Sequence, residues 1–467
     1  MNFFNKSKAT DQVHSKKRAQ GKSGFRKVND FLHLWLGLIS GVIVLIVCLT
    51  GCIWVFNEEI TLLLEPERRV DVQSKSILSP SRIEKIATGV FPGEKLSYAN
   101  YQQGQAIDVG LGDWEADLQY SLKLHPYTGK VISTATHQKD EIIFFEWILS
   151  GHRFLWMPYE IGRPIVNYAT MTFVVLLITG LIWWYPKKWT QSTRDKSFKI
   201  KWDGSLKRVN LDLHNVLGFY ALLFLLAIAL TGMVWGIEWY NKGLYWTTSG
   251  GKTLPEFKRM NSDSLQLNKF YTASQALDNA WNKVTAIHPD AQGFYYGFPD
   301  RADAKSTIDI TVYPTKGQFY NSQSYIFDRH TLRRLEGHLV YDAAYSSAPF
   351  GTKLRKLNYD IHVGSILGFP GKVLAFLSSL IGASLPVTGF IIWWNRKGFG
   401  KSKNKNSRPI SKKQSGNKNL EDIDQLMIKS VSSEAETRKN PVFKQVKNKS
   451  KTVVSTVVSD ENNQNSV

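Results

Sequence analysis

Four long apolar runs dominate the pattern of hydrophobic and polar positions along the chain. They cover residues 31–57, 164–185, 211–240 and 361–395. Each is at least as long as the roughly 20 residues that an α-helix needs to cross a bilayer. Many of the 15 Trp residues stand at the ends of these runs, where aromatic rings settle at a membrane interface. We therefore expect four transmembrane helices, the first of them a retained span and not a cleaved signal peptide.

Two intervening segments have a different pattern. Each opens with a helix-like stretch, near Ser79 in one and Thr272 in the other, and continues with short alternating runs typical of strands. Residues 58–163 and 241–360 are therefore predicted to form two small α+β domains. The expected fold class is an α-helical membrane protein, in which a helix, an α+β domain and a second helix occur twice.

The charge of the chain is concentrated beside the apolar runs. The net charge is +20, and Lys and Arg crowd into residues 1–30, 186–210 and 396–467. Basic segments next to membrane helices mark the cytoplasmic side, and they do not form one nucleic-acid-binding face. We therefore expect a lipid bilayer as partner and no nucleic acid, with both termini cytoplasmic and the α+β domains exported. The tail 396–467 is polar and is predicted to be disordered.

An internal repeat relates the two halves of the chain. The first and third runs share a His-x-x-x-Gly, a Leu-Thr-Gly and a Trp at identical offsets from the histidine. The second and fourth runs share a preceding histidine and a later Thr-Gly followed by Trp-Trp. The chain is therefore interpreted as a tandem duplication, a common way of building membrane proteins.

Four histidines in this repeat are the candidate site residues. His33 and His214 begin runs that start on the cytoplasmic side, whereas His152 and His362 precede runs that start on the outer side. Each pair is expected at one depth, where two imidazoles can bind one haem iron from opposite faces. A glycine one turn after His33 and after His214 would let a flat macrocycle approach the backbone. Any one of these histidines alone could be an interfacial residue or a helix cap, but their pairing by the repeat favours ligation.

Other polar residues carry weaker signals. Arg153 and Lys372 lie near the outer histidines and would either pair with haem propionates or extend to lipid headgroups. The Thr-Gly and Trp-Trp pairs are interpreted as close helix packing and interface anchoring. Four further histidines of the exported segments are expected to be solvated; they are His125, His288, His330 and His338.

These motifs resemble the PepSY-associated transmembrane family over roughly residues 28–398. The resemblance rests on the His-x-x-x-Gly opening, on residues 367–376 and 383–390, and on Trp393-Trp394. It implies a multi-pass protein of the bacterial inner membrane with periplasmic PepSY domains. Some members of this family are haem-containing reductases of ferric siderophores, so the resemblance also implies that the four histidines bind two haems b.

The function predicted is a di-haem transmembrane electron-transfer protein that reduces a periplasmic ferric siderophore, and therefore a haem-dependent ferric reductase. The chain has no G-x-G-x-x-G after a strand and no P-loop, so its electrons would come from a quinol or a separate cytoplasmic reductase. The absence of C-x-x-C-H favours b-type haem. Two alternatives need no haem: a PepSY-type binding or regulatory protein, which inhibits a peptidase or senses a ligand, and an iron or siderophore transporter.

Overall fold

The computed structural model of the chain describes residues 23–113, 116–138, 141–256, 258–266, 270–337 and 340–397. Within them, four helical segments are long and apolar enough to cross a membrane. These are α1 (Gly24–Trp54), α5 (Tyr159–Trp184), the α7–α8 segment (Leu206–Gly236) and the segment that ends in α12 (Ser365–Lys397). The prediction of four spans is confirmed. The basic N-terminus before Ser23 and the tail beyond Lys397, predicted to be cytoplasmic and disordered, lie outside the described residues.

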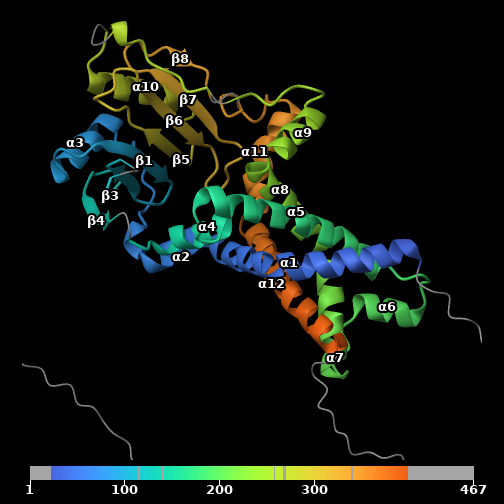
Figure 1. The fold of residues 1–467 in the computed structure, drawn as a ribbon. Coiled ribbons are helices and arrows are strands. Elements are labelled where there is room, and N and C mark those ends of the chain that lie inside the picture. The colour runs from blue at the N-terminus through green and yellow to red at the C-terminus, as the bar shows by residue number, and fades with distance from the viewer. Residues whose placement is uncertain are drawn as a thin grey trace, which may run out of the picture. The chain divides into compact units, whose positions relative to one another are not determined.

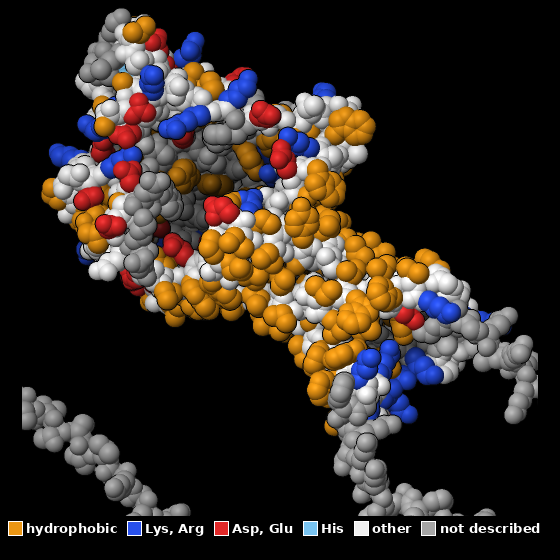
Figure 2. Space-filling model, in the orientation of Figure 1, with side chains coloured by type: hydrophobic (Ala, Val, Ile, Leu, Met, Phe, Trp, Pro, Cys, Tyr) orange, Lys and Arg blue, Asp and Glu red, His pale blue; other side chains and the backbone are white. Residues whose placement is uncertain are grey.

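The four spans carry their apolar side chains outward. Only 22–28% of the most apolar window of each span is buried. Figure 2 shows apolar side chains over the helices and a group of Lys and Arg side chains at the end near α6 (Gln191–Phe198) and α7 (Leu206–Asp212). An apolar surface of this extent is stable in lipid and not in water. The chain is therefore a multi-pass membrane protein.

Eight strands form a single antiparallel sheet in the order β4-β3-β2-β1-β5-β6-β7-β8 (Figure 1). The first half of the chain supplies β1 (Leu96–Gln102), β2 (Ile107–Leu111), β3 (Leu118–Leu124) and β4 (Val131–Gln138). The second half supplies β5 (Gly293–Gly297), β6 (Thr307–Tyr313), β7 (Gln323–Asp328) and β8 (Arg334–Leu335).

The two halves of the sheet join where β1 pairs with β5, from Tyr98 opposite Gly297 to Gln102 opposite Gly293. Without this pairing each half would expose an open edge strand with unpaired backbone groups. The prediction of an α-helical membrane protein is therefore wrong as a fold class, because the chain is mixed α/β with one sheet shared by both repeats. Long apolar runs give a strong local signal, whereas pairing between strands almost 200 residues apart gives none.

One hydrophobic core lies between the sheet and two helices, α3 (Pro80–Val90) and α10 (Ala273–Ile287). The alternation along β6 explains which face is covered, since Ile308, Ile310 and Val312 are fully buried while the residues between them face the other way. α10 begins with a capping box between Thr272 and Gln275.

Short helices connect the sheet to the spans. They are α2 (Asn57–Leu64), α4 (Phe144–Phe154), α9 (Glu238–Thr248) and α11 (Phe350–Val363). Single turns complete the described elements: η1 (Pro66–Arg68), η2 (Leu213–Leu217), η3 (Ser264–Gln266) and η4 (Ser365–Leu367). α8 (Gly218–Gly236) follows η2 without a break, and α12 itself begins at Gly368. α4 and α11 occupy equivalent places in the two repeats, each directly before a span.

A side-chain contact between α3 and α10 links the two repeats. The Asp278 carboxylate accepts hydrogen bonds from the backbone N–H (2.9 Å) and the hydroxyl (2.5 Å) of Ser81, in the first turn of α3. Asp278→Ala should lower the free energy of unfolding by about 1–3 kcal/mol, because it leaves that helix end without its anionic cap. Thermal unfolding in detergent measures the change. Asn282→Ala, at an exposed position of the same helix, is the control, and equal behaviour of the two variants would contradict the role of this cap.

Candidate functional site

The four candidate histidines form two pairs in the structure. The ring centres of His33, on α1, and His214, on η2, lie 6.3 Å apart. Those of His152, on α4, and His362, on α11, lie 6.1 Å apart. An imidazole nitrogen binds a first-row metal at about 2 Å, so two rings on opposite sides of one metal have centres roughly 6 Å apart. Both spacings fit one metal between two imidazoles.

The two pairs lie at different levels of the helical bundle. Thr50, which contacts His152, stands 17 residues after His33 on α1. At 1.5 Å per residue the two levels are about 25 Å apart along this helix. The second repeat has the same offset, from His214 to Thr231, which contacts His362. His214 differs from His33 in lying on a π-helical turn, a feature often found at functional sites.

Each histidine is held by the Thr-Gly pair of another helix. The distance from Nδ1 to the threonine hydroxyl oxygen is 2.9 Å for His33 with Thr179 and for His214 with Thr388. It is 3.1 Å for His362 with Thr231 and 3.3 Å for His152 with Thr50. In the outer pair Nδ1 also contacts a backbone carbonyl, that of Val47 (2.9 Å) or Ile228 (3.0 Å). The sequence pattern of these Thr-Gly pairs predicts helix packing, and it did not indicate their contact with the histidines.

The hydroxyl geometry fixes the tautomer of each imidazole. Each of the four threonines donates its only hydroxyl proton to the carbonyl four residues earlier on its own helix, at 2.7–2.9 Å. The hydroxyl can therefore only accept from the histidine, as can a backbone carbonyl. Nδ1 must carry the proton, and Nε2 keeps the lone pair that binds a metal. Within the described part of the chain, these imidazoles form their hydrogen bonds through Nδ1.

The glycine of each Thr-Gly pair makes room for the imidazole ring. A Cβ added to this glycine would lie 3.1–3.3 Å from Cε1 of the histidine; the glycines are Gly51, Gly180, Gly232 and Gly389. That separation is tighter than ordinary van der Waals contact. The glycines one turn after His33 and His214, which the sequence analysis singled out, line the inner cavity, but an added Cβ there would meet leucine side chains at 3.8 and 3.4 Å.

An asparagine four residues before the histidine strengthens three of the four contacts. Its side-chain amide donates to the backbone carbonyl of the same threonine at 3.0–3.1 Å; the donors are Asn29, Asn210 and Asn358. The fourth position is Ile148, which is buried. The Asn-x-x-x-His spacing was visible in the sequence, and it is the signal that could have indicated the helix contact.

The inner pair, His33 and His214, lines a cavity of about 300 Å³. Its walls include five glycines and the rings of Trp183, Trp184 and Trp393, and the charged side chains of Asp30 and Arg396 also line it. Glycines on several facing helices leave a slot between backbones that a flat group can enter.

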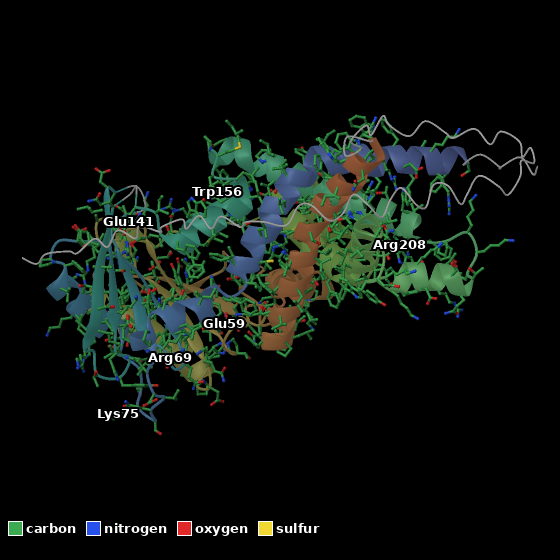
Figure 3. The ribbon with its side chains drawn as sticks, turned by 90° about the horizontal axis from the view of Figure 1, so that it is seen from below. Glu59, Arg69, Lys75, Glu141, Trp156 and Arg208 are labelled. Carbon is green, nitrogen blue, oxygen red and sulfur yellow. The ribbon has the colours of Figure 1, made fainter. Side chains whose placement is uncertain are left out.

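The outer pair, His152 and His362, lines a larger cavity of about 800 Å³ that extends to strands β6 and β7. Of the two cations considered in the sequence analysis, Arg153 lines this cavity, whereas Lys372 binds Glu59 at 2.7 Å and lines a different one. Figure 3 shows Glu59 on the side of the helices nearer the sheet and Arg208 at the end away from it. Val44 and Phe173 line both the inner and the outer cavity, so they form a shared wall between them.

Each histidine pair offers a metal two neutral nitrogen ligands. Two neutral imidazoles are fewer ligands than a metal such as zinc takes from protein, and the described residues contain no group of three or more His, Cys, Asp or Glu that could hold a metal ion. A porphyrin supplies its own four nitrogens and needs only axial ligands from the protein. The donor set of each histidine pair therefore suits a haem better than a metal ion held by protein ligands alone.

The other histidines are not all solvated as expected. His330 is buried, and its Nε2 lies 2.8 Å from the carbonyl oxygen of Ala304, so its solvation was predicted wrongly. Nε2 of His288 lies 2.6 Å from the Tyr325 hydroxyl. His338 lies outside the described residues.

Comparison with known proteins supports the family assignment. The model of the PepSY-associated TM region matches residues 31–396. No curated protein matches the chain. The family model covers all four histidines of the two sites, two whole spans and most of the first and fourth spans. The chain therefore belongs to the PepSY-associated transmembrane family.

Proposed function

We propose that this chain is a di-haem b electron-transfer protein of the bacterial inner membrane that reduces an Fe(III)-siderophore on the side of the sheet. The observation that carries the proposal is the pair of sites in which Nδ1 of every histidine is anchored and Nε2 is left for a metal. Two such sites at two levels of one bundle would give redox centres near both membrane faces if each held a haem.

The residues of the chain would each have a defined part. His33 and His214 would hold the inner haem, and His152 and His362 the outer one. Bound haem would supply a one-electron Fe(III)/Fe(II) couple. The threonine contacts orient the imidazoles and raise their basicity as ligands. Val44 and Phe173, which line both cavities, put apolar side chains between the two sites.

The orientation of the chain in the membrane is inferred from the positions of its basic segments. The basic N-terminus, the 186–210 loop and the tail favour an orientation with both termini in the cytoplasm, which would leave the sheet in the periplasm. Electrons would enter at the inner site from a quinol or a separate cytoplasmic reductase, because the sequence has no nucleotide-binding motif. The acceptor would be reduced beside the outer site, where conversion of Fe(III) to Fe(II) weakens the grip of hard oxygen ligands.

Histidine variants test the haem assignment directly. The purified protein should show reduced-minus-oxidised bands of bis-His b-type haem at about two haems per chain. His33→Ala and His152→Ala should each remove about one haem, because each deletes one of two axial ligands. Pyridine haemochrome assay measures the content. His137→Ala, on strand β4, should retain both haems. A wild-type protein that stays colourless when haem is supplied would leave the binding or regulatory alternative.

A glycine variant tests the inner site without deleting a ligand. Gly180→Val adds carbon atoms where even a Cβ would lie 3.3 Å from Cε1 of His33, so it displaces the ring from Thr179. We expect loss of the inner haem and retention of the outer one, about half of the total content. Gly243→Val, at a position on α9 with open space around it, is the control. Full haem content in Gly180→Val would show that this helix contact does not position the ligand.

A further inference from the structure

The outer cavity has more room and more charge than a pair of axial histidines requires. Both cavities have the same histidine, threonine and glycine frame, yet the outer one measures about 800 Å³ and the inner one about 300 Å³. The outer lining contains four cations, Arg153, Arg163, Arg355 and Lys356, and no Asp or Glu among its described residues. Cations concentrated along one cavity attract an anion.

Two of these cations are adjacent on α11, between the histidine pair and the sheet. Lys356 is only 2% exposed, and its ammonium donates to the carbonyls of Ser322 (2.8 Å) and Ala343 (2.7 Å). These two carbonyls use two of the three donors of the ammonium. Burial lowers the pKa of Lys356 to about 8, and the Asp342 carboxylate offsets part of this effect. Arg355 is half-buried and forms no ion pair with any described residue.

The wall opposite these cations consists of hydroxyl groups on the sheet. Thr311 and Tyr313 project from the face of β6 that is not covered by α3 and α10, and Ser324 lies beside them on β7. The rings of Tyr341 and Tyr359 also line the cavity. Hydroxyl and phenol groups donate to oxygen acceptors, so this end of the cavity suits a ligand rich in anionic oxygen.

We propose that the space between α11 and the β6–β7 face is the acceptor site and that it selects anionic, oxygen-rich ferric chelates through Arg355 and Lys356. The choice of iron as the metal in the chelate comes from the proposed function, and the inference rests on that function to this extent. The chelate would lie beside the His152–His362 pair, with its negative charge against α11 and its oxygen atoms toward the hydroxyl groups of the sheet.

The same cations could instead bind the propionates of the outer haem, which have the same carboxylate chemistry. Arg153 lies on α4 and Arg163 on α5, two helices of the first repeat. Arg355 and Lys356 lie on α11 of the second repeat, on the side of the cavity toward the sheet. We therefore assign the chelate to Arg355 and Lys356, and the experiment separates the two sources by haem content.

The probe is gallium(III) citrate, an anionic chelate whose metal is not reduced, added to the full chain in detergent. Isothermal titration calorimetry measures its affinity, and haem content is measured in parallel. Arg355→Gln should weaken binding by about tenfold, the loss expected for one charge-assisted contact, with unchanged haem content. The matched control is Lys353→Gln on the same helix, whose ammonium lies over the ring of Tyr345 and does not line the cavity. It should bind within about twofold of the wild type.

Three outcomes would overturn the acceptor site. They are no binding of gallium citrate by the wild type, equal binding by Arg355→Gln, or loss of the outer haem in Arg355→Gln, which would assign this cation to the propionates. Lys356→Gln should weaken binding in the same direction, but Lys356 also holds two backbone carbonyls, so Arg355→Gln decides the question. A wild type that binds gallium citrate but no haem would refute the proposed function and leave the anion site standing.

Discussion

A threonine hydroxyl that has given its proton to its own helix can accept one hydrogen bond from a neighbour, and the two histidine sites depend on this constraint. In each site the imidazole ring packs against the glycine of a neighbouring helix. It donates from Nδ1 to the threonine of that helix and keeps Nε2 free. The contact fixes ring orientation, tautomer and helix spacing together. The structure repeats it four times, at two levels and in both halves of the chain.

The duplication gives the inner and outer sites the same frame, and the surroundings make them different. The inner site lies among tryptophans and apolar helix faces. The outer site opens toward a sheet that both repeats build together through the β1–β5 pairing. The buried Lys356 on α11 lines that space, and the buried Asp360 on the same helix accepts from the backbone N–H of Phe319, in the β6–β7 connection. The second repeat therefore ties the sheet to the outer site.

The sequence was sufficient for the spans and for the pairing of the histidines, because long apolar runs and identical offsets are local and countable. The partners of Thr50 and Thr179 could not be predicted, since these contacts join residues 102 and 146 positions apart. The shared sheet was missed for the same reason: β1 and β5 each look like an ordinary edge strand until they meet. The burial of Lys356 was also not predictable, because lysine is almost always exposed and its two acceptors are backbone carbonyls.

Electron transfer across a sealed membrane is the most direct test of the central claim. The protein would be reconstituted in vesicles that contain a trapped water-soluble reductant, with a ferric chelate and the impermeant Fe(II) indicator ferrozine outside. Fe(II) is expected to appear outside vesicles with the haem-loaded wild type and not with His33→Ala, which breaks the path at the inner site. The contradicting result is that both haems are bound and reduced from inside the vesicles while no Fe(II) forms outside. The protein would then not pass electrons to an external ferric chelate.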